Sequence, residues 1–279
     1  FVGSTPVAKN IYETSAISGK RCQALGGAKN HALILPDADI DYTTDQLISA
    51  AFGSSGQRCM ALSVAVVFSD IKDEFIKDLE KKVLKLKYGL DDLNSNSFGP
   101  LVSKEHLESV KNYINMSEEE GAKVLVDGRD LLKRKNSNNG YFLGPTIIDN
   151  VSSNMRSYQN EIFGPVLQII EVNKLSDAIK IINDNRFGNG CCIFTRSGEQ
   201  ARSFSENVEI GMVGVNIPLP VPSSFHSFGG WKNSLFGDLN IYGPDGVRFY
   251  TQRKTITQRW PSSGSSKGVD LSMPNNLKQ

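Results

Sequence analysis

The second half of the sequence alternates short apolar runs with helical segments, and this alternation limits the possible folds more than any other feature. Strands are predicted at 166–172, 191–195 and 212–216, with helices between them at 176–185 and 199–207. Strands that alternate with helices are typical of a parallel sheet whose faces are covered by the helices. The sequence therefore predicts an α/β domain with a mostly parallel sheet.

The first half carries the same two kinds of segment at less regular spacing. The stretch 70–87 is amphipathic, because Ile71, Phe75 and Leu79 repeat on one stripe. Charges of both signs interleave on its other face, which is typical of a solvated surface. Further helices are predicted at 7–18, 44–52 and 103–121, further strands at 32–35, 61–68, 123–127 and 141–148, and a polar turn at 134–140.

The end of the chain lacks this alternation. Residues 218–228 are expected to form an irregular loop at the mouth of a site. Residues 249–260 alternate polar and larger side chains like an exposed strand, and exposed strands commonly pair with another chain. Residues 261–279 are rich in Ser, Gly and Asn and are expected to form a flexible tail. We therefore predict an oligomerisation strand followed by a tail.

Composition excludes several classes of protein. The 279 residues suffice for one large α/β domain or two smaller ones. A net charge of +1 gives no electrostatic reason to expect nucleic acid or acidic membranes as partners. No apolar run approaches the roughly 18 residues of a membrane-spanning helix. Four cysteines without paired spacing and three scattered histidines predict neither a disulfide framework nor a metal site.

The stretch 53–59, Gly-Ser-Ser-Gly-Gln-Arg-Cys, joins a predicted helix to a predicted strand and is the candidate site. A glycine-rich bend lets the backbone approach a ligand closely. It leaves Cys59 at a corner where its thiol and its own N–H can face one cavity, and Arg58 beside it favours the thiolate. The alternative is a small buried hydrophobe, which is how Cys22, Cys191 and Cys192 are interpreted.

Two charged residues have ordinary interpretations from the residues alone. Lys29 precedes the predicted strand 32–35 and is expected to be a solvated lysine, with a ligand role as the alternative. Glu161 is expected to be a surface carboxylate.

The chain starts at Phe1 inside what reads as the middle of a domain, so we interpret it as the C-terminal part of a longer polypeptide. Any targeting peptide would then lie upstream. Ser4 and Thr5 followed by Pro6 signal the start of a helix. A helix N-terminus is a natural seat for phosphate, although an ordinary capped helix is the expected interpretation here.

Taken together, these pieces resemble the aldehyde dehydrogenase superfamily in order over about residues 1–260. Phe-Val-Gly-Ser-Thr at 1–5 is similar to its Phe-Thr-Gly-Ser element, Gly-Gln-Arg-Cys at 56–59 to its nucleophile loop, and Glu-Ile-Phe-Gly-Pro-Val at 161–166 to its cofactor-ribose loop. Four motifs narrow the resemblance to the CoA-acylating methylmalonate-semialdehyde dehydrogenase branch: Gly-Ala-Lys-Asn-His at 27–31, Gly-Gln-Arg-Cys-Met-Ala-Leu-Ser at 56–63, Gly-Gly-Trp-Lys at 229–232 and Phe-Tyr-Thr-Gln at 249–252.

The resemblance implies a role for each of five residues. Cys59 would be the nucleophile, and Arg58 would bind the carboxylate of a semialdehyde, with a purely packing role as its alternative. Glu161 would bind the nicotinamide ribose of NAD, Phe163 would line the nicotinamide site, and Ser4 would lie by the pyrophosphate. The acyl group would pass from Cys59 to coenzyme A, giving propionyl-CoA from methylmalonate semialdehyde or acetyl-CoA from malonate semialdehyde. Such a reaction belongs to valine and pyrimidine catabolism.

Leu25 differs from the residue that hydrolytic members of the family carry at this position, and the difference bears on how the acyl group leaves Cys59. Hydrolytic relatives carry Glu in a Glu-Leu-Gly-Gly-Lys element, and aligning its lysine with Lys29 places Leu25 at the glutamate. Leucine cannot accept a proton from water, which favours CoA as acyl acceptor. A hydrolytic, NAD(P)-dependent aldehyde dehydrogenase remains the rival in the same class. A folded but inactive oligomerisation module is the rival in another class.

The resemblance also implies an organisation and a setting. It divides the chain into a remnant of the NAD-binding domain at 1–28, a catalytic domain at 29–230, a bridging segment with the oligomerisation strand at 231–260, and the tail at 261–279. The oxyanion-hole asparagine and most of the cofactor domain would lie upstream. The protein would be a homo-oligomer, a tetramer or dimer, located in mitochondria if eukaryotic and in the cytoplasm if bacterial.

Overall fold

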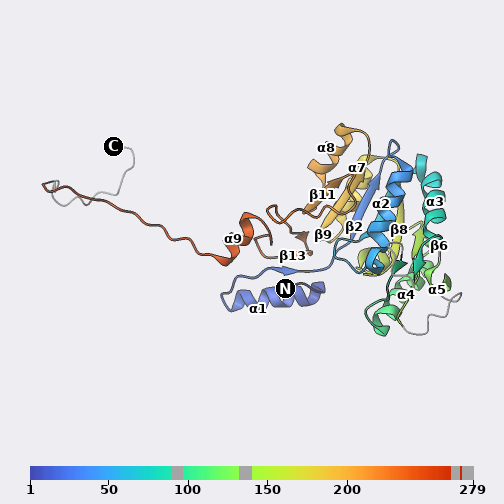
Figure 1. Cartoon of the computed structure of the whole chain (residues 1–279), viewed down its shortest axis with the longest axis horizontal. Helices are drawn as coiled ribbons and strands as arrows, with labels where there is room; N and C mark the ends of the chain where they lie inside the picture. The colour runs from blue at the N-terminus through green and yellow to red at the C-terminus, as the bar shows by residue number, and fades with distance from the viewer. Residues whose placement is uncertain (89–96, 132–139, 265–270, 272–279) are drawn as a thin grey trace.

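The chain folds into an α/β body and a smaller lobe beside it. The structure is a computed structural model and describes residues 1–88, 97–131, 140–264 and 271. Figure 1 shows the body on one side, with helices α1 and α9 beyond its edge and the chain after α9 leading away from both.

The helices and strands follow one another with short connections. The helices are α1 (Thr5–Ile17), α2 (Ile40–Phe52), α3 (Ser69–Val83), α4 (Lys104–Glu119), α5 (Gly128–Leu131), α6 (Arg156–Gln159), α7 (Leu175–Asp184), α8 (Gly198–Asn207) and α9 (Pro244–Tyr250), with a 3-10 turn at Gly53–Gly56. The strands are β1 (Ala24–Leu25), β2 (Asn30–Ile34), β3 (Leu62–Phe68), β4 (Lys87–Tyr88), β5 (Ser97–Phe98), β6 (Lys123–Val126), β7 (Thr146–Asp149), β8 (Val166–Val172), β9 (Phe187–Gly188), β10 (Gly190–Phe194), β11 (Met212–Val215), β12 (Trp231–Lys232) and β13 (Leu235–Phe236).

The body is built on one seven-stranded sheet with the order β11-β10-β2-β3-β8-β7-β6. Every neighbouring pair is parallel except β6 and β7, which are antiparallel at one edge. The alternation of strands and helices in the sequence predicts this arrangement, and the expected α/β fold with a mostly parallel sheet is confirmed.

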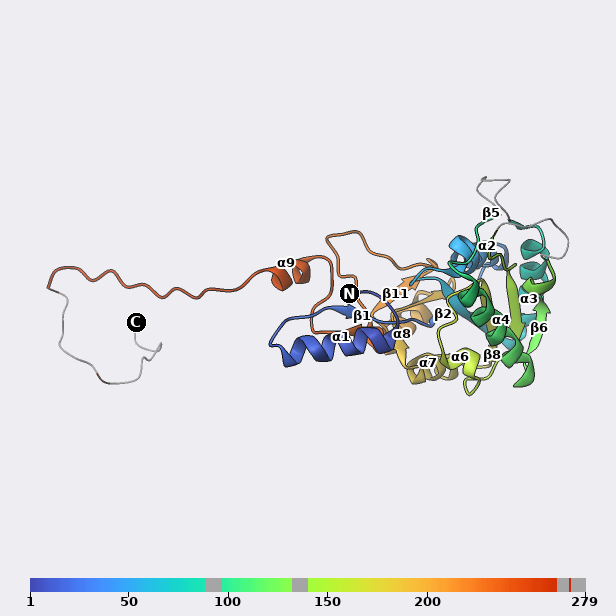
Figure 2. The same cartoon turned by 90° about the horizontal axis from the view of Figure 1, so that it is seen from below.

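Helices cover both faces of this sheet, as the two views in Figures 1 and 2 show. Within β3, Val64 and Val66 pack on the side of α4, α7 and α8, whereas Ala65 and Val67 pack on the side of α2 and α3. All four side chains are fully buried. Burial of one such valine contributes about 1.5–3 kcal/mol, so the two apolar layers hold the sheet in place.

The N-terminal ends of the parallel strands lie on the same side of the sheet, and segments that are distant in the sequence come together there. The segments that lead into β3, β8 and β10 contain Cys59, Glu161 and Asn189, and β2 itself begins at Asn30. Because these four strands are neighbours in the sheet, the segments that lead into them meet at the N-terminal ends of the strands.

The smaller lobe joins the start of the chain to a segment that follows residue 230. Strand β1 pairs antiparallel with β13, so that Ala24 lies opposite Phe236 and Leu25 opposite Leu235. Val2 also forms a bridge with Leu25. The segment at 1–28 therefore packs with the segment after residue 230, and Figure 1 shows β13 beside α1.

Four expected elements differ from the observed ones by more than two residues, and the first of them, the helix predicted at 44–52, already starts at Ile40. The strand predicted at 141–148 starts only at Thr146, and the helix predicted at 70–87 ends at Val83. The exposed strand predicted at 249–260 is wrong for the single chain: α9 extends to Tyr250, and residues 251–260 have no assigned secondary structure. A strand needs a neighbour to bond with, and the described sheets do not reach this segment. Of the turn predicted at 134–140, residues 134–139 lie outside the described residues, as does most of the tail.

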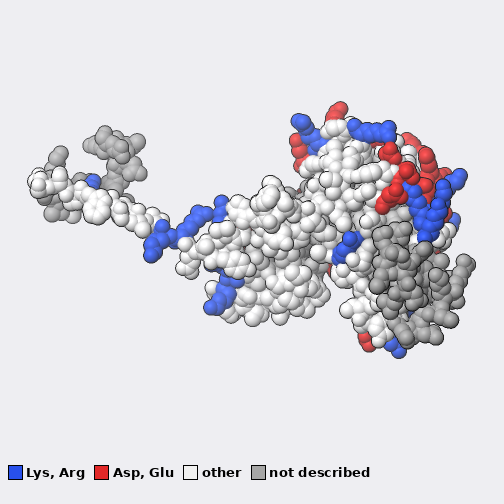
Figure 3. Space-filling view, in the orientation of Figure 1, with Lys and Arg blue, Asp and Glu red and all other residues white. Residues whose placement is uncertain are grey.

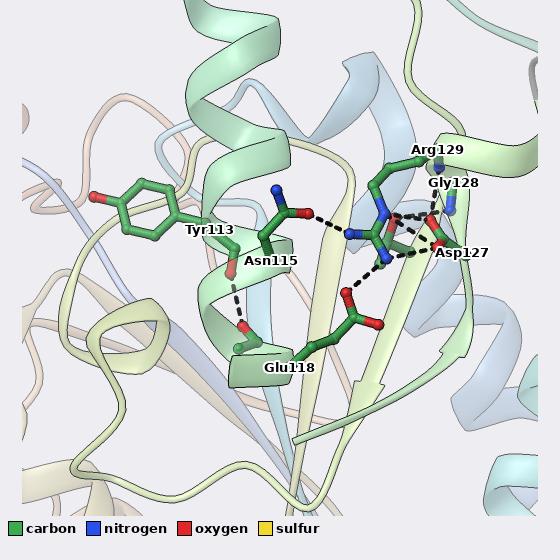
Figure 4. Close-up of polar contacts among 8 residues, drawn as sticks. Tyr113, Asn115, Glu118, Asp127, Gly128 and Arg129 are labelled. Atoms are coloured by element: carbon green, nitrogen blue, oxygen red, sulfur yellow. Dashed lines mark hydrogen bonds and ion pairs between the residues drawn. The ribbon is translucent and has the colours of Figure 1, made fainter. Parts of the chain in front are cut away.

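An ion-pair network fixes α4, which supports one side of the candidate site. The Arg129 guanidinium lies 2.8 Å from Glu118 of α4 and 2.6 Å from Asp127 at the end of β6 (Figure 4). Asn115 of α4 accepts a further hydrogen bond from the same side chain. A planar guanidinium suits several acceptors at once, so Arg129 ties α4 to the edge of the sheet.

Charged side chains of both signs interleave on the α/β body, as Figure 3 shows for one face. On the outer surface of α2 and α3, for example, Lys82 contacts Asp41, Asp45 and Asp78 at 2.8, 2.8 and 3.1 Å. This mixture agrees with the solvated outer face predicted for α3. Of the helices that the structure describes, none combines the length and the apolarity that crossing a bilayer requires.

Candidate active site

Cys59 follows a strained turn between α2 and β3 and is exposed. Ser54, Ser55 and Gly56 all have positive φ angles, of 54°, 55° and 67°. This conformation suits glycine and costs other residues energy, so the bend is maintained by its surroundings. The sequence predicts a glycine-rich bend here, and the structure shows how sharply it turns.

The loop at 53–59 touches the segment 161–166 through two glycines. A Cβ atom at Gly56 would lie 2.1 Å from the carbonyl oxygen of Gly164, which is too close for any side chain. A Cβ atom at Gly164 would in turn lie 2.8 Å from Val110 of α4. The backbones of the two loops are therefore in contact, and Gly164 packs directly against the Val110 side chain of α4, which leaves no room for a side chain at either glycine.

Four of the five predicted site residues line one cavity between these loops. Cys59, Arg58, Glu161 and Phe163 all border it. Ser4 lies outside this cavity. The chain thus brings an exposed thiol, a guanidinium and a carboxylate together from segments about a hundred residues apart.

The other cysteines differ from Cys59. Cys191 and Cys192 are buried in β10, and burial raises the pKa of both thiols well above the usual range. Cys22 is half-buried. A thiol that is costly to ionise is a poor nucleophile, which agrees with the prediction that Cys191 and Cys192 are small core residues.

Glu161 is half-buried and is held from the side of β2. Its Oε1 accepts a hydrogen bond of 2.9 Å from the backbone N–H of Ala28. A Cβ atom at Gly27 would lie 2.7 Å from its Oε2, so a side chain there would displace the carboxylate from this position. Burial raises the pKa of Glu161, against the opposing effect of the Ala28 hydrogen bond. Glu161 is therefore not the surface carboxylate that the residues alone predict.

Phe163 is held by a histidine that the sequence analysis does not single out. It has a φ angle of 57°, and its carbonyl oxygen lies 2.8 Å from Nε2 of His106. A carbonyl can only accept, so this Nε2 carries the proton. The backbone N–H of His106 is itself held by the side chain of Ser103, the N-cap of α4. Helix α4 thus fixes the backbone around Phe163.

Lys29 is fully buried, so the expectation of a solvated lysine is wrong. Its Nζ donates to the backbone carbonyls of Ser157 and Asn160, at 2.7 and 2.8 Å. Burial lowers the pKa of Lys29 to about 7, although the nearby Glu161 carboxylate opposes this effect. The side chain holds the segment that leads into Glu161. No periodic pattern around Lys29 distinguishes it from a surface lysine.

Two buried asparagines, Asn30 and Asn189, are also missed by the sequence analysis. Both donate hydrogen bonds to the backbone carbonyl of Cys59. Asn30 stands inside the Gly-Ala-Lys-Asn-His motif, which is the one signal that could have indicated it. Asn189 has no comparable signal, because it belongs to a turn between two short strands.

Arg58 borders the cavity but is anchored elsewhere. Its Nη2 donates to the carbonyls of Ser49 and Ala50 at 2.6 and 3.2 Å, which places the guanidinium at the C-terminal end of α2. A Cβ atom at Gly53 would lie 2.5 Å from this Nη2. Burial lowers the pKa of Arg58, and its buried Nε has no hydrogen-bond partner among the described residues. Nη1 donates no hydrogen bond to the described residues, so its N–H groups are left for a ligand.

Ser4 and Leu25 lie on the small-lobe side of the site. Ser4 is the N-cap of α1, and its side chain makes no capping hydrogen bond. Thr5 Oγ1 accepts a hydrogen bond of 2.9 Å from the Gly27 N–H, so the start of α1 and Glu161 meet at Gly27. Leu25 is buried in β1 and is not among the described residues that line the Cys59 cavity.

Comparison with known proteins places the chain within one family. The model of the aldehyde dehydrogenase family matches residues 1–256. A malonate-semialdehyde dehydrogenase of Pseudomonas aeruginosa is 52% identical over 275 residues, which is 98% of this chain and 55% of the relative.

Solved structures agree with this placement. A crystal structure of methylmalonate-semialdehyde dehydrogenase from Oceanimonas doudoroffii superposes with a TM-score of 0.91 at 58% identity, covering 95% of this chain and 54% of that one. A Sinorhizobium meliloti structure that is assigned to the same enzyme and complexed with NAD has a TM-score of 0.90 at 46% identity, with the same coverage of 95% and 54%. The chain spans about half the length of the curated relatives that it matches.

Proposed function

The chain belongs to the aldehyde dehydrogenase family, and on that premise we propose that it carries the nucleophile half of an NAD-dependent, CoA-acylating semialdehyde dehydrogenase. The observation that carries this proposal is the single cavity bordered by the exposed Cys59 and by Glu161. A nucleophile and a group suited to a cofactor must lie side by side for an aldehyde to be oxidised between them.

The first step is the addition of the Cys59 thiolate to the carbonyl carbon of the aldehyde. A sulfur–carbon bond forms, the carbonyl π bond breaks, and the oxygen becomes an oxyanion near the backbone N–H of Cys59. NAD, when bound, supplies an acceptor for the hydride on that carbon. Loss of the hydride restores the carbonyl and leaves a thioester on Cys59.

The chain's own residues fit the cofactor at two points. The backbone N–H of Ala28 already donates to Oε1 of Glu161, so Oε2 is the atom that can accept hydrogen bonds from ribose hydroxyls. The start of α1 at Ser4 offers backbone N–H groups to a pyrophosphate. Gly27 lies between these two points without a side chain to fill the space. Phe163 borders the same cavity and would contact the nicotinamide.

Release of the acyl group is proposed to use coenzyme A. Its thiol attacks the thioester carbonyl, Cys59 leaves as a thiolate, and acyl-CoA forms. The bond between the carboxylate and its neighbouring carbon breaks, CO2 leaves and is hydrated to bicarbonate in water, and the electron pair that stays on the carbon next to the thioester takes up a proton from solvent. Support comes from Leu25, which is buried and cannot activate a water.

Hydrolysis is the second candidate, and one observation favours it. Glu161 is a carboxylate in the same cavity, and its raised pKa suits a general base better than an ordinary carboxylate would. Product analysis with and without CoA separates the two reactions. Acyl-CoA that forms only with CoA supports the proposal, and free acid that forms at an undiminished rate without CoA overturns it.

The substrate is proposed to be methylmalonate or malonate semialdehyde, with propionyl-CoA or acetyl-CoA as the product, in valine and pyrimidine catabolism. The relatives from Pseudomonas and Oceanimonas carry the names of these activities. Arg58 is the cation in the cavity that suits the substrate carboxylate, through the Nη1 end of its guanidinium.

The wider organisation is proposed on the same basis. Residues 29–230 would be the catalytic domain, with 1–28 as a remnant of the NAD-binding domain, 231–260 as bridge and oligomerisation segment, and 261–279 as tail. Exposed residues such as Tyr250, Ile256 and Trp260 support pairing with a second copy, as a dimer or tetramer. The location would be the cytoplasm of a bacterium or the mitochondria of a eukaryote.

This chain alone could instead be an inactive oligomerisation module. NADH absorbance after mixing the chain with NAD, CoA and malonate semialdehyde decides between the two. NADH formation supports the enzyme, and its absence here, with NADH from a longer form of the protein, supports the module.

A further inference from the structure

The backbone carbonyl of Cys59 accepts hydrogen bonds from two buried side chains that the proposed reaction does not use. The Nδ2 atoms of Asn30 and Asn189 each lie 2.9 Å from this oxygen. The two asparagines are 2% and 6% exposed. A carbonyl oxygen has two lone pairs, so the carbonyl of Cys59 is saturated by side chains from two separate segments.

The same two carboxamides bond the neighbouring residues of the loop. Asn30 Nδ2 also donates to the carbonyl of Ala61 at 2.9 Å, and its Oδ1 accepts from the N–H of Gly190 at 3.0 Å. Asn189 Nδ2 also lies 3.1 Å from the sulfur of Met60. Asn30 therefore connects the start of β2 with the loop before β3 and the start of β10, and Asn189 ties the start of β10 to the same loop.

This bonding fixes a turn whose outer side carries the thiol. The N–H of Ala61 donates to the carbonyl of Arg58 at 2.9 Å, so residues 58–61 form a turn with Cys59 as its second residue. Cys59 is exposed, yet its carbonyl points inward to the buried donors. The peptide between residues 59 and 60 cannot rotate without leaving buried N–H groups unpaired, which is costly.

We propose that Asn30 and Asn189 are positioning residues that orient Cys59 so that its thiol and its own N–H face the cavity shared with Glu161. This inference rests on the proposed function, because it concerns the same nucleophile. Ordinary satisfaction of buried carbonyls does not require two donors from separate segments on one oxygen of an exposed residue. The two carboxamides fix the orientation of the turn at residues 58–61, and addition of the Cys59 thiol to an aldehyde depends on that orientation.

The effect of this orientation on the first step alone can be measured by adding an aldehyde in the absence of NAD. The Cys59 sulfur bonds to the carbonyl carbon of propanal, the carbonyl π bond breaks, and the thiol proton is transferred to the oxygen. Propanal is uncharged, so its binding does not involve Arg58. Formation of the adduct protects Cys59 from iodoacetamide, and peptide mass spectrometry measures alkylation at Cys59 with Cys22 as an internal standard.

The decisive variant is Asn189→Leu, which keeps the approximate size and removes both donors. We expect the propanal concentration that half-protects Cys59 to rise about tenfold, which corresponds to about 1.4 kcal/mol. The rate of alkylation without propanal should change by less than about threefold, because iodoacetamide makes no use of an oriented N–H. If circular dichroism shows that Asn189→Leu does not fold, Asn189→Ala, which cannot clash, replaces it.

Asn185→Leu is the matched control. Asn185 is 5% exposed and accepts a hydrogen bond from the Phe187 N–H at 3.0 Å, away from Cys59. Its loss should leave protection by propanal unchanged. Equal protection in wild type and Asn189→Leu overturns the positioning role and leaves the proposed function standing. A wild type that propanal never protects overturns both.

Discussion

Replacement of the buried Lys29 by methionine should change how the stability of the protein depends on pH. The Lys29 ammonium is fully buried and donates to two backbone carbonyls, and no carboxylate is bonded to it directly in the described structure. Burial lowers its pKa from 10.5 to about 7. Lys29→Met keeps an unbranched apolar stem of similar length and removes the titrating group.

The magnitude follows from proton linkage. Above pH 7 the folded protein releases the Lys29 proton, whereas the unfolded chain keeps it up to about pH 10.5. The unfolded state therefore binds more protons in this window, and the free energy of unfolding rises with pH. One pH unit is worth about 1.4 kcal/mol when the difference is fully developed, so the wild type should gain about 3 kcal/mol from pH 7 to pH 9.5 relative to Lys29→Met.

Urea unfolding followed by circular dichroism at several pH values measures this difference. Lys72→Met is the matched control, because Lys72 is also buried but bonds to Asp149 and Glu171 at 3.0 Å each. Burial opposes ionisation there, yet these partners outweigh it and raise the pKa of Lys72. Lys72 stays protonated in both states up to pH 9.5, so its variant should show a constant difference from wild type. The same flat difference for Lys29→Met would refute the linkage argument.

Two further substitutions test the site. Arg58→Leu should reduce kcat/KM roughly 30-fold more for carboxylated semialdehydes than for uncharged aldehydes, because only the former need the guanidinium; this ratio corresponds to about 2 kcal/mol of transition-state stabilisation. Steady-state kinetics with both classes of aldehyde checks this, and equal losses for the two classes would remove the carboxylate role. Gly56→Ala should lower the free energy of unfolding by at least about 3 kcal/mol, because the new methyl group would overlap the Gly164 carbonyl. Gly19 also has a positive φ angle but has open space around it, so Gly19→Ala should lower the free energy of unfolding by only about 1 kcal/mol in the same urea assay. If the two substitutions were equally destabilising, contact between the two loops could not be the cause of the loss at Gly56.

Periodicity was sufficient to predict the sheet. The alternation of runs such as 166–172 and 191–195 with helices of similar length leaves few arrangements other than a covered parallel sheet. The observed β8 (Val166–Val172) has the predicted bounds, and β10 (Gly190–Phe194) differs by one residue at each end. Local pattern and global fold agree here because both faces of these strands are buried.

Long-range contacts were not predictable from the same patterns. Lys29 looks like any lysine in a polar stretch, and only the backbone carbonyls at 157 and 160, far away in the sequence, explain its burial. The pairing of β1 with β13 is also invisible, because each strand has only two residues. For Asn30 and Asn189, the common partner is a backbone oxygen, which leaves no pattern of side-chain types.

Mapping the acylated residue tests the central claim most directly. The protein is incubated with NAD and malonate semialdehyde without CoA, quenched in acid to preserve thioesters, digested and analysed by peptide mass spectrometry. We predict an acyl mass on the peptide that contains Cys59, absent from Cys59→Ala and removed by added CoA. An acyl group on Cys22, Cys191 or Cys192, or NADH formation that persists in Cys59→Ala, would contradict the account.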